Sequence, residues 1–335
     1  MILATLRDGS ADGTLLVVNK ARKRAVAAGA VAPTMQAALD RWDAVAPDLQ
    51  ALSQRLESND VADDFEIDVD QLMAPLPRAF AYFDGGCYPH HIIPIRAVRG
   101  VPLPEDFYVR PLMYEGCSAP IVGPTEPLRL LKDEEWGVDI EAELAAVVGD
   151  VPAGVERSQA AKYIRLLVLY NDVSLRQLAS PELARGFGFL QSKPVSSMAP
   201  FAITPDEAGD LWTGEFLGGR YLVHVRGQVL GDLDPGKDNI YTWPDLIAHA
   251  AKTRPLVAGT LVAAGTMGNE DRRHGCGCIA ELRGREHMAE GSARTPYLRF
   301  GDSYRLELFD RAGRSVFGAI DQRLEQLPQP ENRHA

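Results

Sequence analysis

The spacing of apolar residues divides the chain into two parts that differ in their predicted secondary structure. Residues 2–6 and 15–18 are apolar runs separated by a polar, glycine-containing turn, which predicts a β-hairpin. Residues 33–56 carry apolar positions at helical spacing, with Pro47 as an interruption, which predicts a helix. The acidic stretch 59–64 then predicts an exposed connection. We therefore expect a small N-terminal α/β domain, residues 1–75.

Beyond residue 78, short apolar runs alternate with turns, which is typical of β-rich structure. Expected strands cover residues 221–225, 229–230, 256–264 and 297–300, followed by a hairpin of 304–309 and 315–320. Expected helices cover residues 158–166, with Ser158 as a cap, and 243–251, with Thr242 as a cap and Pro244 in the first turn. The pattern favours an α+β, β-rich fold whose large second domain, residues 76–330, is built on a mixed β-sheet.

Residues 137–149 carry the pattern that is most suggestive of chemistry. Apolar and polar residues alternate, as in a half-buried strand, and Asp139, Glu141 and Glu143 share one face. Because two residues along a strand span about 6.6 Å with side chains parallel, the two glutamates can converge on one cation. A divalent cation would relieve their mutual repulsion. A solvated acidic face on an edge strand would give the same pattern, so this segment alone leaves both interpretations open.

Two further segments place single charges next to apolar runs. Residues 166–170 are apolar and are followed by Asn171 and Asp172, so a buried strand could deliver this carboxylate to a site, although an Asx turn is equally compatible. Lys193 is the single charge in residues 187–194, where it either serves a site or extends to water.

Residues 83–91 form a third segment of interest. Asp84, Tyr88, His90 and His91 fall within what the sequence predicts to be a turn-rich loop, which suits metal binding and acid–base chemistry but also an ordinary turn. On an extended loop adjacent side chains point in opposite directions, so only one of the two histidines would face a site.

Together these features form an ordered set. The order is Asp84, His91, Tyr114, Glu141-x-Glu143, Asn171-Asp172, Lys193, Gly265-Thr266 and Glu281. This order resembles the fumarylacetoacetate hydrolase family from about residue 78 to the C-terminal region. The N-terminal part, with Leu6-Arg7-Asp8-Gly9 and the helical segment from Ala32 to Trp42, resembles bacterial members that have an extra N-terminal domain. The resemblance implies that residues 76–330 form the catalytic domain of this family.

The resemblance implies a divalent cation, usually Mg²⁺, Ca²⁺ or Mn²⁺. Its ligands would be Glu141, Glu143 and Asp172, with Asp84 as a closer or water-bridged fourth. A ligand set of oxygen atoms alone fits a hard cation.

The resemblance also assigns the reacting groups. The general base would be His91, seven positions after Asp84, oriented by Glu281, which is expected on a strand after the Gly-Thr turn. Lys193 would stabilise the carbanion or oxyanion that forms during cleavage. Groups expected to hold substrate carboxylates are Tyr88, Arg96, Arg99, Tyr114 and Thr266.

These roles predict hydrolysis of a carbon–carbon bond in fumarylacetoacetate-like or acylpyruvate-type 1,3-diketo acids, with a link to aromatic amino acid catabolism. The chemistry needs a metal to draw charge from the diketo oxygens, a base for water and a cation for the departing enolate. Decarboxylation of 2-oxo acids and isomerisation of hydroxydienoates are alternatives on the same scaffold, and a non-catalytic, metal-stabilised binding protein is another. Gln177 and residues 269–277 depart from the family pattern, at positions where we expect substrates to be distinguished.

Other constellations carry weaker signals. His274, Cys276 and Cys278, with His90, could be read as a zinc site, but the spacing fits no usual zinc motif. The chain contains no Gly-x-Ser-x-Gly sequence, which argues against a serine hydrolase.

Composition narrows the class of protein. The net charge of −11, without a basic stripe, argues against nucleic-acid binding, and the apolar stretches are too short or too interrupted to span a membrane. The N-terminus becomes charged too early for a signal peptide, and four scattered cysteines suggest no disulfide framework, so we expect a cytoplasmic protein. The family resemblance and the apolar, strand-rich C-terminal half predict a homodimer.

Overall fold

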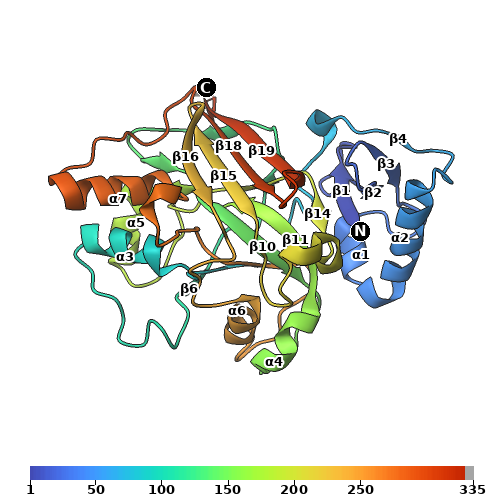
Figure 1. The fold of residues 1–335 in the computed structure, drawn as a ribbon, viewed down its shortest axis with the longest axis horizontal. Helices are drawn as coiled ribbons and strands as arrows, with labels where there is room; N and C mark the ends of the chain where they lie inside the picture. Colours follow the sequence, from blue (N-terminus) through green and yellow to red (C-terminus); the bar gives the residue numbers. More distant parts are fainter. Residues whose placement is uncertain (329–335) are drawn as a thin grey trace, which may run out of the picture.

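The computed structural model describes residues 1–328 and shows a β-rich molecule with helices around the sheets (Figure 1). The largest sheet has twelve strands. Ten follow the order β4 (Phe65–Glu66), β3 (Arg24–Ala27), β2 (Thr14–Val18), β1 (Ile2–Leu6), β14 (Ala202–Ile203), β11 (Ile164–Asn171), β10 (Ala142–Val148), β17 (Thr260–Ala263), β5 (Tyr82–Gly85) and β6 (Met113–Glu115). The other two are β13 (Ser196–Met198), which pairs with β11, and β7 (Ile121–Val122), which pairs with β13.

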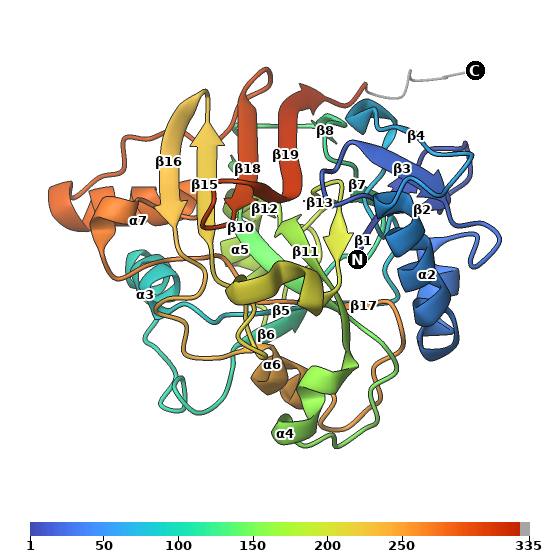
Figure 2. The ribbon, with the colours of Figure 1, turned by 45° about the vertical axis from the view of Figure 1, so that its right-hand side comes forward.

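A second sheet packs beside the first. It has five strands in the order β16 (Gln228–Leu233), β15 (Arg220–Val225), β18 (Ser303–Phe309), β19 (Ser315–Gln326) and β8 (Leu128–Leu130), four of which stand side by side in Figure 2. A short ladder pairs β9 (Val138–Asp139) with β12 (Ser174–Leu175). The α+β, β-rich fold expected from the sequence is confirmed.

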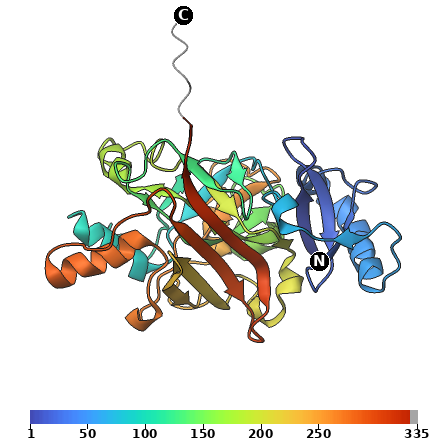
Figure 3. The ribbon, with the colours of Figure 1, turned by 90° about the horizontal axis from the view of Figure 1, so that it is seen from above.

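Helices gather at the ends of the molecule. The α-helices are α1 (Met35–Leu39), α2 (Trp42–Glu57), α3 (Pro89–Val98), α4 (Arg157–Ala160), α5 (Arg176–Leu183), α6 (Trp243–Ala250) and α7 (Ile279–Glu290). The 3₁₀ helices are η1 (Val69–Gln71), η2 (Ala161–Tyr163), η3 (Pro205–Leu211) and η4 (Arg272–His274). Helices α1 and α2 lie with the N-terminal strands at one end, and α3 and α7 lie at the other (Figures 1 and 3). No helix within residues 1–328 is both long and apolar enough to cross a lipid bilayer.

The N-terminal residues extend the main sheet. Strand β1 pairs antiparallel with β14, with Ile2 opposite Ile203, so the hairpin of β1 and β2 is continuous with the central strands. The first 75 residues, expected as a separate domain, thus share backbone hydrogen bonds with the rest of the protein.

The central strands are buried on both faces. Every residue of β10 is buried; Leu144, Ala146 and Val148 face one apolar core, and Ala145 and Val147 face the other. Strand β10 is therefore not half-buried, and the solvated acidic face considered above is wrong for Glu143, whose side chain is fully enclosed. A carboxylate in such a strand needs compensating charge or a proton.

Several local expectations are corrected by the structure. The segment 33–56 forms two helices, because the chain breaks between α1 and α2 at Asp40 and Arg41. The helix expected over 158–166 stops at η2, since the β-branched, apolar run from Ile164 pairs with β10. Residues 297–300 make a single bridge, Leu298 to Val138, and no strand.

The two corrections that matter most concern the expected site. Residues 83–91 are the end of β5 followed by the start of α3, whose first turn begins at Pro89 and contains both histidines. Residues 278–282 form the start of helix α7 and not a strand, because Cys278 and Asp139 cap its first turn.

Glycine lets two segments cross closely beside the strand ends. Gly265 follows β17 with φ +77°, and a Cβ there would lie 2.6 Å from the carbonyl oxygen of Gly85. A Cβ on Gly268 would lie 2.7 Å from the backbone nitrogen of His91. The loop after β17 can therefore lie directly against β5 and the first turn of α3.

We predict that Gly265→Ala destabilises the fold more than Gly9→Ala. Both glycines have positive φ, but a Cβ on Gly9 meets nothing within 4 Å. Gly9→Ala should cost about 1 kcal/mol from backbone strain alone, and Gly265→Ala about 2–4 kcal/mol because the Gly85 carbonyl must also move. Urea unfolding midpoints at constant m-value measure both changes. Equal losses would show that the close approach at Gly265 relaxes freely.

Candidate active site

Three carboxylates converge where the strands of the main sheet end. Asp84 lies on β5, Glu143 on β10, and Asp172 directly follows β11. One oxygen from each lies within 4.8 Å of the others, and all three side chains are buried. The adjacency of β11, β10, β17 and β5 produces this acid cluster, because it brings three distant parts of the sequence to one edge.

Two carboxylates of the acid cluster are only partly compensated within the described residues. Asp84 Oδ1 and Glu143 Oε2 are buried and have no hydrogen-bond partner among residues 1–328. Burial and repulsion from Asp172 raise the pKa of Asp84 to about 7. Burial and repulsion from Asp84 likewise raise the pKa of Glu143 well above its usual value. Oxygen ligands this close, with free lone pairs, fit a hard divalent cation.

Lys193 closes one side of the acid cluster. Its Nζ donates to Glu141 Oε2 at 2.5 Å, to Asp172 Oδ2 at 2.6 Å and to Ser174 Oγ at 2.7 Å, which satisfies all three ammonium protons. Although burial acts in the opposite direction, Asp172 and Glu141 raise the pKa of Lys193, so it stays charged. Tyr114 donates a further hydrogen bond to Asp172 Oδ2.

Arg176 forms the second cationic support. Its guanidinium donates to Glu141 Oε1 at 2.7 Å and to Asp139 Oδ2 at 2.9 Å. Against the effect of burial, Lys193 and Arg176 hold the pKa of Glu141 below its usual value. Glu141 is therefore ionised and engaged by two cations, unlike Glu143 two residues further along the chain.

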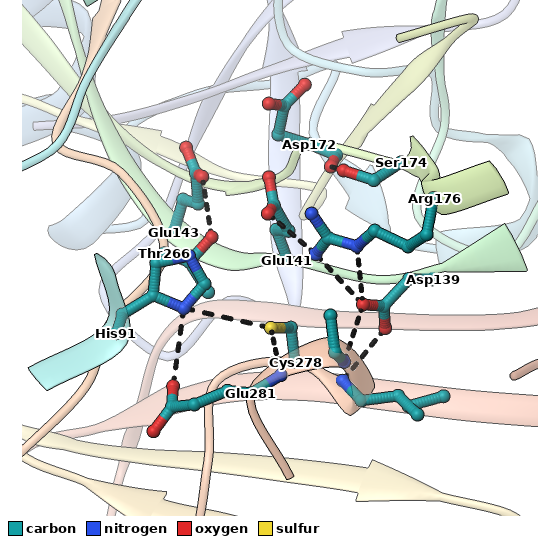
Figure 4. A network of polar contacts seen from close by, with 12 residues as sticks. His91, Asp139, Glu141, Glu143, Asp172, Ser174, Arg176, Thr266, Cys278 and Glu281 are labelled. Atoms are coloured by element: carbon teal, nitrogen blue, oxygen red, sulfur yellow. Dashed lines mark hydrogen bonds and ion pairs between the residues drawn. The ribbon is translucent and has the colours of Figure 1, made fainter. Parts of the chain in front are cut away.

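Asp139 connects this network to helix α7. Its two carboxylate oxygens accept the backbone N–H groups of Ile279 at 2.8 Å and Ala280 at 2.9 Å, as an N-terminal cap does. This contact fixes the first turn of α7, and Figure 4 shows Glu281 leaving that turn toward His91.

His91 and Glu281 form a pair at the same site. His91 Nδ1 lies 3.3 Å from Glu281 Oε2, and Arg285 donates to the other oxygen, Oε1, at 2.5 Å. Glu281 is fully buried, so its orientation is fixed. With Nδ1 directed at Glu281, Nε2 of His91 is left for chemistry (Figure 4).

A cavity of about 530 Å³ joins these groups. Asp84, His91, Glu141, Lys193 and Thr266 all contribute to its wall. Its volume is within the range of pockets that hold small molecules. Asp84 of the acid cluster, Glu141, His91 and Lys193 thus open onto one space.

The remaining predicted substrate-binding residues are divided by the structure. Tyr114, Arg96 and Arg99 line the cavity. The hydroxyl of Thr266 contacts Glu143 at 3.4 Å. Tyr88 is buried, donates to the Pro235 carbonyl at 2.7 Å and is not among the residues described along the cavity wall.

The histidine and cysteines considered for zinc do not assemble as a group within the described residues. His274 Nδ1 contacts the Asp232 carbonyl at 2.8 Å. Cys278 lies instead with His91 and Glu141, with one potential ligand atom from each within 4.8 Å of the others. His90, expected as a competitor of His91, does not line the cavity that the described residues enclose.

Sequence reasoning gave no role to Arg176, Ser174 or Asp139. Asp139 carried a usable signal, because it alternates with Glu141 and Glu143 on the acidic face. Arg176 and Ser174 had none: only the pairing of β12 with β9 brings them to Glu141 and Lys193.

Comparison with known proteins adds to this geometry. A match in sequence joins the chain to the mitochondrial oxaloacetate tautomerase of Xenopus laevis, 26% identical over 171 residues, which are 50% of each chain. The chain therefore matches only half the length of that relative.

Two solved structures share the fold. The maleylpyruvate hydrolase of Sphingobium sp. SYK-6, in complex with manganese(II) and pyruvate, gives a TM-score of 0.65 at 17% identity, covering 98% of this chain and 100% of that one. A probable 2-hydroxyhepta-2,4-diene-1,7-dioate isomerase from Mycobacterium abscessus gives 0.64 at 19% identity, with the same coverage. At this identity the similarity shows the fold alone.

Family models cover nearly the whole chain. The one described as Fumarylacetoacetase N-terminal domain 2 matches residues 1–78, and the one described as Fumarylacetoacetate (FAA) hydrolase C-terminal matches residues 81–325. The resemblance inferred from the ordered site residues is thereby confirmed. The chain belongs to the fumarylacetoacetate hydrolase family and carries an additional N-terminal domain.

Proposed function

We propose that the acid cluster holds a divalent cation: Mg²⁺, Ca²⁺ or Mn²⁺. Asp84, Glu143 and Asp172 would supply oxygen atoms, whereas Glu141, which the family resemblance also assigns as a ligand, is engaged by Lys193 and Arg176. The unpartnered oxygens of Asp84 and Glu143 support the proposal, because a cation would supply the missing partner. The solved maleylpyruvate hydrolase contains manganese(II), which is consistent with this class of ion.

We propose further that the protein is an enzyme that hydrolyses a carbon–carbon bond in a 1,3-diketo acid of the fumarylacetoacetate or acylpyruvate type. The supporting observation is that Asp84 of the acid cluster, His91 and Lys193 open onto one cavity, with Glu281 behind His91 and Asp172 bound to Lys193. A metal with a purely structural role would require neither the His91–Glu281 pair nor Lys193. The cation would polarise the diketo oxygens of the bound substrate.

The roles of the side chains follow from their positions. His91 accepts a proton from water at Nε2 as the water oxygen attacks the distal carbonyl carbon, while Glu281 stabilises the imidazolium through Nδ1. When the carbon–carbon bond breaks, its electron pair goes to the pyruvate enolate, near the Lys193 ammonium. Protonation of that enolate gives pyruvate, and the acyl part leaves as a carboxylate. One water is consumed and no redox change occurs.

Proton transfer without cleavage is the second candidate function. A tautomerase or isomerase needs a base beside a carbon next to a carbonyl group, which His91 also supplies. The tautomerase in Xenopus laevis favours this alternative. Product analysis separates the two, since only hydrolysis releases two acids; the same analysis detects decarboxylation of 2-oxo acids.

Assembly and location are proposed from the family resemblance and the composition of the chain. We propose a cytoplasmic homodimer whose partners are small diketo acids and not nucleic acids or membranes. Light scattering at micromolar concentration tests the dimer, and a monomer mass would remove it.

We predict that metal affinity rises with pH between 6 and 8. Without a bound metal, the folded protein keeps a proton on Asp84 up to a pKa of about 7. In the unfolded chain the same carboxyl group releases its proton near pH 4. This proton therefore contributes stability below pH 4 that is lost as pH rises through 7. A cation must displace it, so affinity should gain up to about tenfold per pH unit below 7.

Calorimetric titration with Mg²⁺ at pH 6, 7 and 8 measures this dependence. Asp84→Asn should bind more weakly and show a shallower pH profile, because the titrating group is gone. An affinity for Mg²⁺ that does not change between pH 6 and 8 would show that the metal does not displace a proton from Asp84.

We predict that His91→Ala abolishes hydrolysis of acylpyruvates and that Glu281→Gln removes most of it, with metal binding intact in both. His90→Ala is the matched control and should retain most activity, because His90 is adjacent in α3 but outside the cavity wall. Pyruvate release from a panel of diketo acids, with and without Mg²⁺, provides the measurement. An inactive His90→Ala beside an active His91→Ala would reverse the assignment, and activity in both would remove the mechanism.

We predict that Lys193→Ala lowers kcat, with a loss of about 2–4 kcal/mol of transition-state stabilisation. The affinity for Mg²⁺ should not fall. The ammonium faces charge that develops during cleavage, whereas its loss leaves the acid cluster more negative and so no less attractive to a cation. Steady-state kinetics and metal titration give the two values. Parallel loss of metal affinity would show that Lys193 is a structural counter-ion.

A further inference from the structure

The cavity has an inner and an outer part of different chemistry. The inner part carries Asp84 of the acid cluster, Glu141, His91 and Lys193. The outer wall is formed by apolar side chains that are only partly buried: Ile92, Ile95 and Val98 of α3, Leu112 before β6, Leu183 of α5 and Phe189. Six apolar side chains from separate segments thus face one space, and their contact with water would be relieved by an apolar ligand.

Aromatic rings mark the boundary between the two parts. The rings of Tyr114 and Phe189 meet edge to face with centroids 4.7 Å apart. Lys193 Nζ lies 5.5 Å from the Tyr114 centroid and 5.8 Å from that of Phe189. The ammonium is therefore on the inner side of these rings, together with Asp172 and Glu141, and does not serve the outer part.

Two arginines line the outer part, and neither is placed as a buried anion site. The Arg96 guanidinium is engaged by the Pro102 carbonyl, with donor–acceptor distances of 3.0 and 2.5 Å. Arg99 is exposed, and within residues 1–328 its guanidinium makes no hydrogen bond or ion pair. A carboxylate bound at Arg99 would gain little, because this guanidinium is exposed to water.

We propose that the substrate carries an apolar acyl group in the outer part of the cavity, so that the protein acts on 3-acylpyruvates with an alkyl or aryl tail and discriminates against tails that end in a carboxylate. This inference rests on the proposed function for the inner part. The diketo acid head occupies the acid cluster, and the tail replaces water along Ile92, Ile95, Val98, Leu112, Leu183 and Phe189. Hydrolysis then yields pyruvate and an apolar carboxylic acid.

The test compares two isosteric tails on one head group. 4-Methylpentanoylpyruvate ends in an isopropyl group where succinylpyruvate ends in a carboxylate, and acetylpyruvate supplies the head with almost no tail. With the Mg²⁺-loaded enzyme, kcat/KM should rise about fourfold for each added methylene in a straight alkyl series. The isopropyl tail should be favoured over the carboxylate by about 100-fold or more, because the carboxylate loses its solvation against an apolar wall.

A matched pair of variants locates the effect. Ile95→Ala should reduce the preference for the isopropyl tail about tenfold, where the preference is kcat/KM for 4-methylpentanoylpyruvate divided by kcat/KM for acetylpyruvate. Ile93→Ala removes the same side chain from the same helix, but Ile93 does not line the cavity and should change neither value. Equal effects of the two variants would show that the preference depends on the helix as a whole, and would contradict the proposal that the apolar cavity wall binds the tail.

Failure of the proposal is distinguishable from failure of the proposed function. If no acylpyruvate is cleaved, the hydrolase proposal is wrong. The preference for an apolar tail is then tested by calorimetry, which compares the binding of 2-oxohexanoate and 2-oxoadipate in the presence of Mg²⁺. Tighter binding of 2-oxohexanoate supports the apolar wall, and tighter binding of 2-oxoadipate overturns it. If acetylpyruvate is cleaved but succinylpyruvate is preferred, and Arg99→Met removes that preference, the tail is acidic and the apolar inference is wrong.

Discussion

The crowding of carboxylates in a buried place is the constraint on which the site depends. Five acidic side chains, Asp84, Asp139, Glu141, Glu143 and Asp172, share it with two cationic ones, Lys193 and Arg176, so the formal balance is −5 + 2 = −3. Such an excess is unfavourable in a medium that screens charge poorly. Protons on the carboxylates of raised pKa relieve it in the metal-free protein, and a divalent cation would relieve it further.

The same charges also hold secondary structure in place. Asp139 accepts two backbone N–H groups of α7 and an Arg176 donor, so the helix that carries Glu281 is fixed to β9, which directly precedes Glu141 and β10. Arg285, one turn further along α7, holds the second oxygen of Glu281. A histidine base needs an orienting partner that cannot rotate, and this chain of contacts provides one with few degrees of freedom.

Much of the fold class and the candidate site was predictable, because it depends on local sequence patterns and on the order of the site residues along the chain. The acidic alternation of 137–143, the strand ending at Asp172 and the lone Lys193 were visible in the sequence, and the order of residues identified the family. Local pattern could not show that β10 is covered on both faces, or that Cys278 begins a helix. Those outcomes depend on strand order and on a cap from Asp139, 140 residues away. Arg176 was hidden for the same reason.

Two carboxylates that lie two residues apart, Glu141 just before β10 and Glu143 within it, have opposite electrostatic environments, and this difference organises the site. Glu141 faces Lys193 and Arg176, which lower its pKa, whereas Glu143 faces Asp84 and Asp172 in a buried space, which raises its pKa. The two therefore suit different tasks: Glu141 anchors cations of the protein itself, and Glu143 is available to an added one. A strand places residues i and i+2 on the same face but at positions about 6.6 Å apart, which is enough for different neighbours to decide the charge of each.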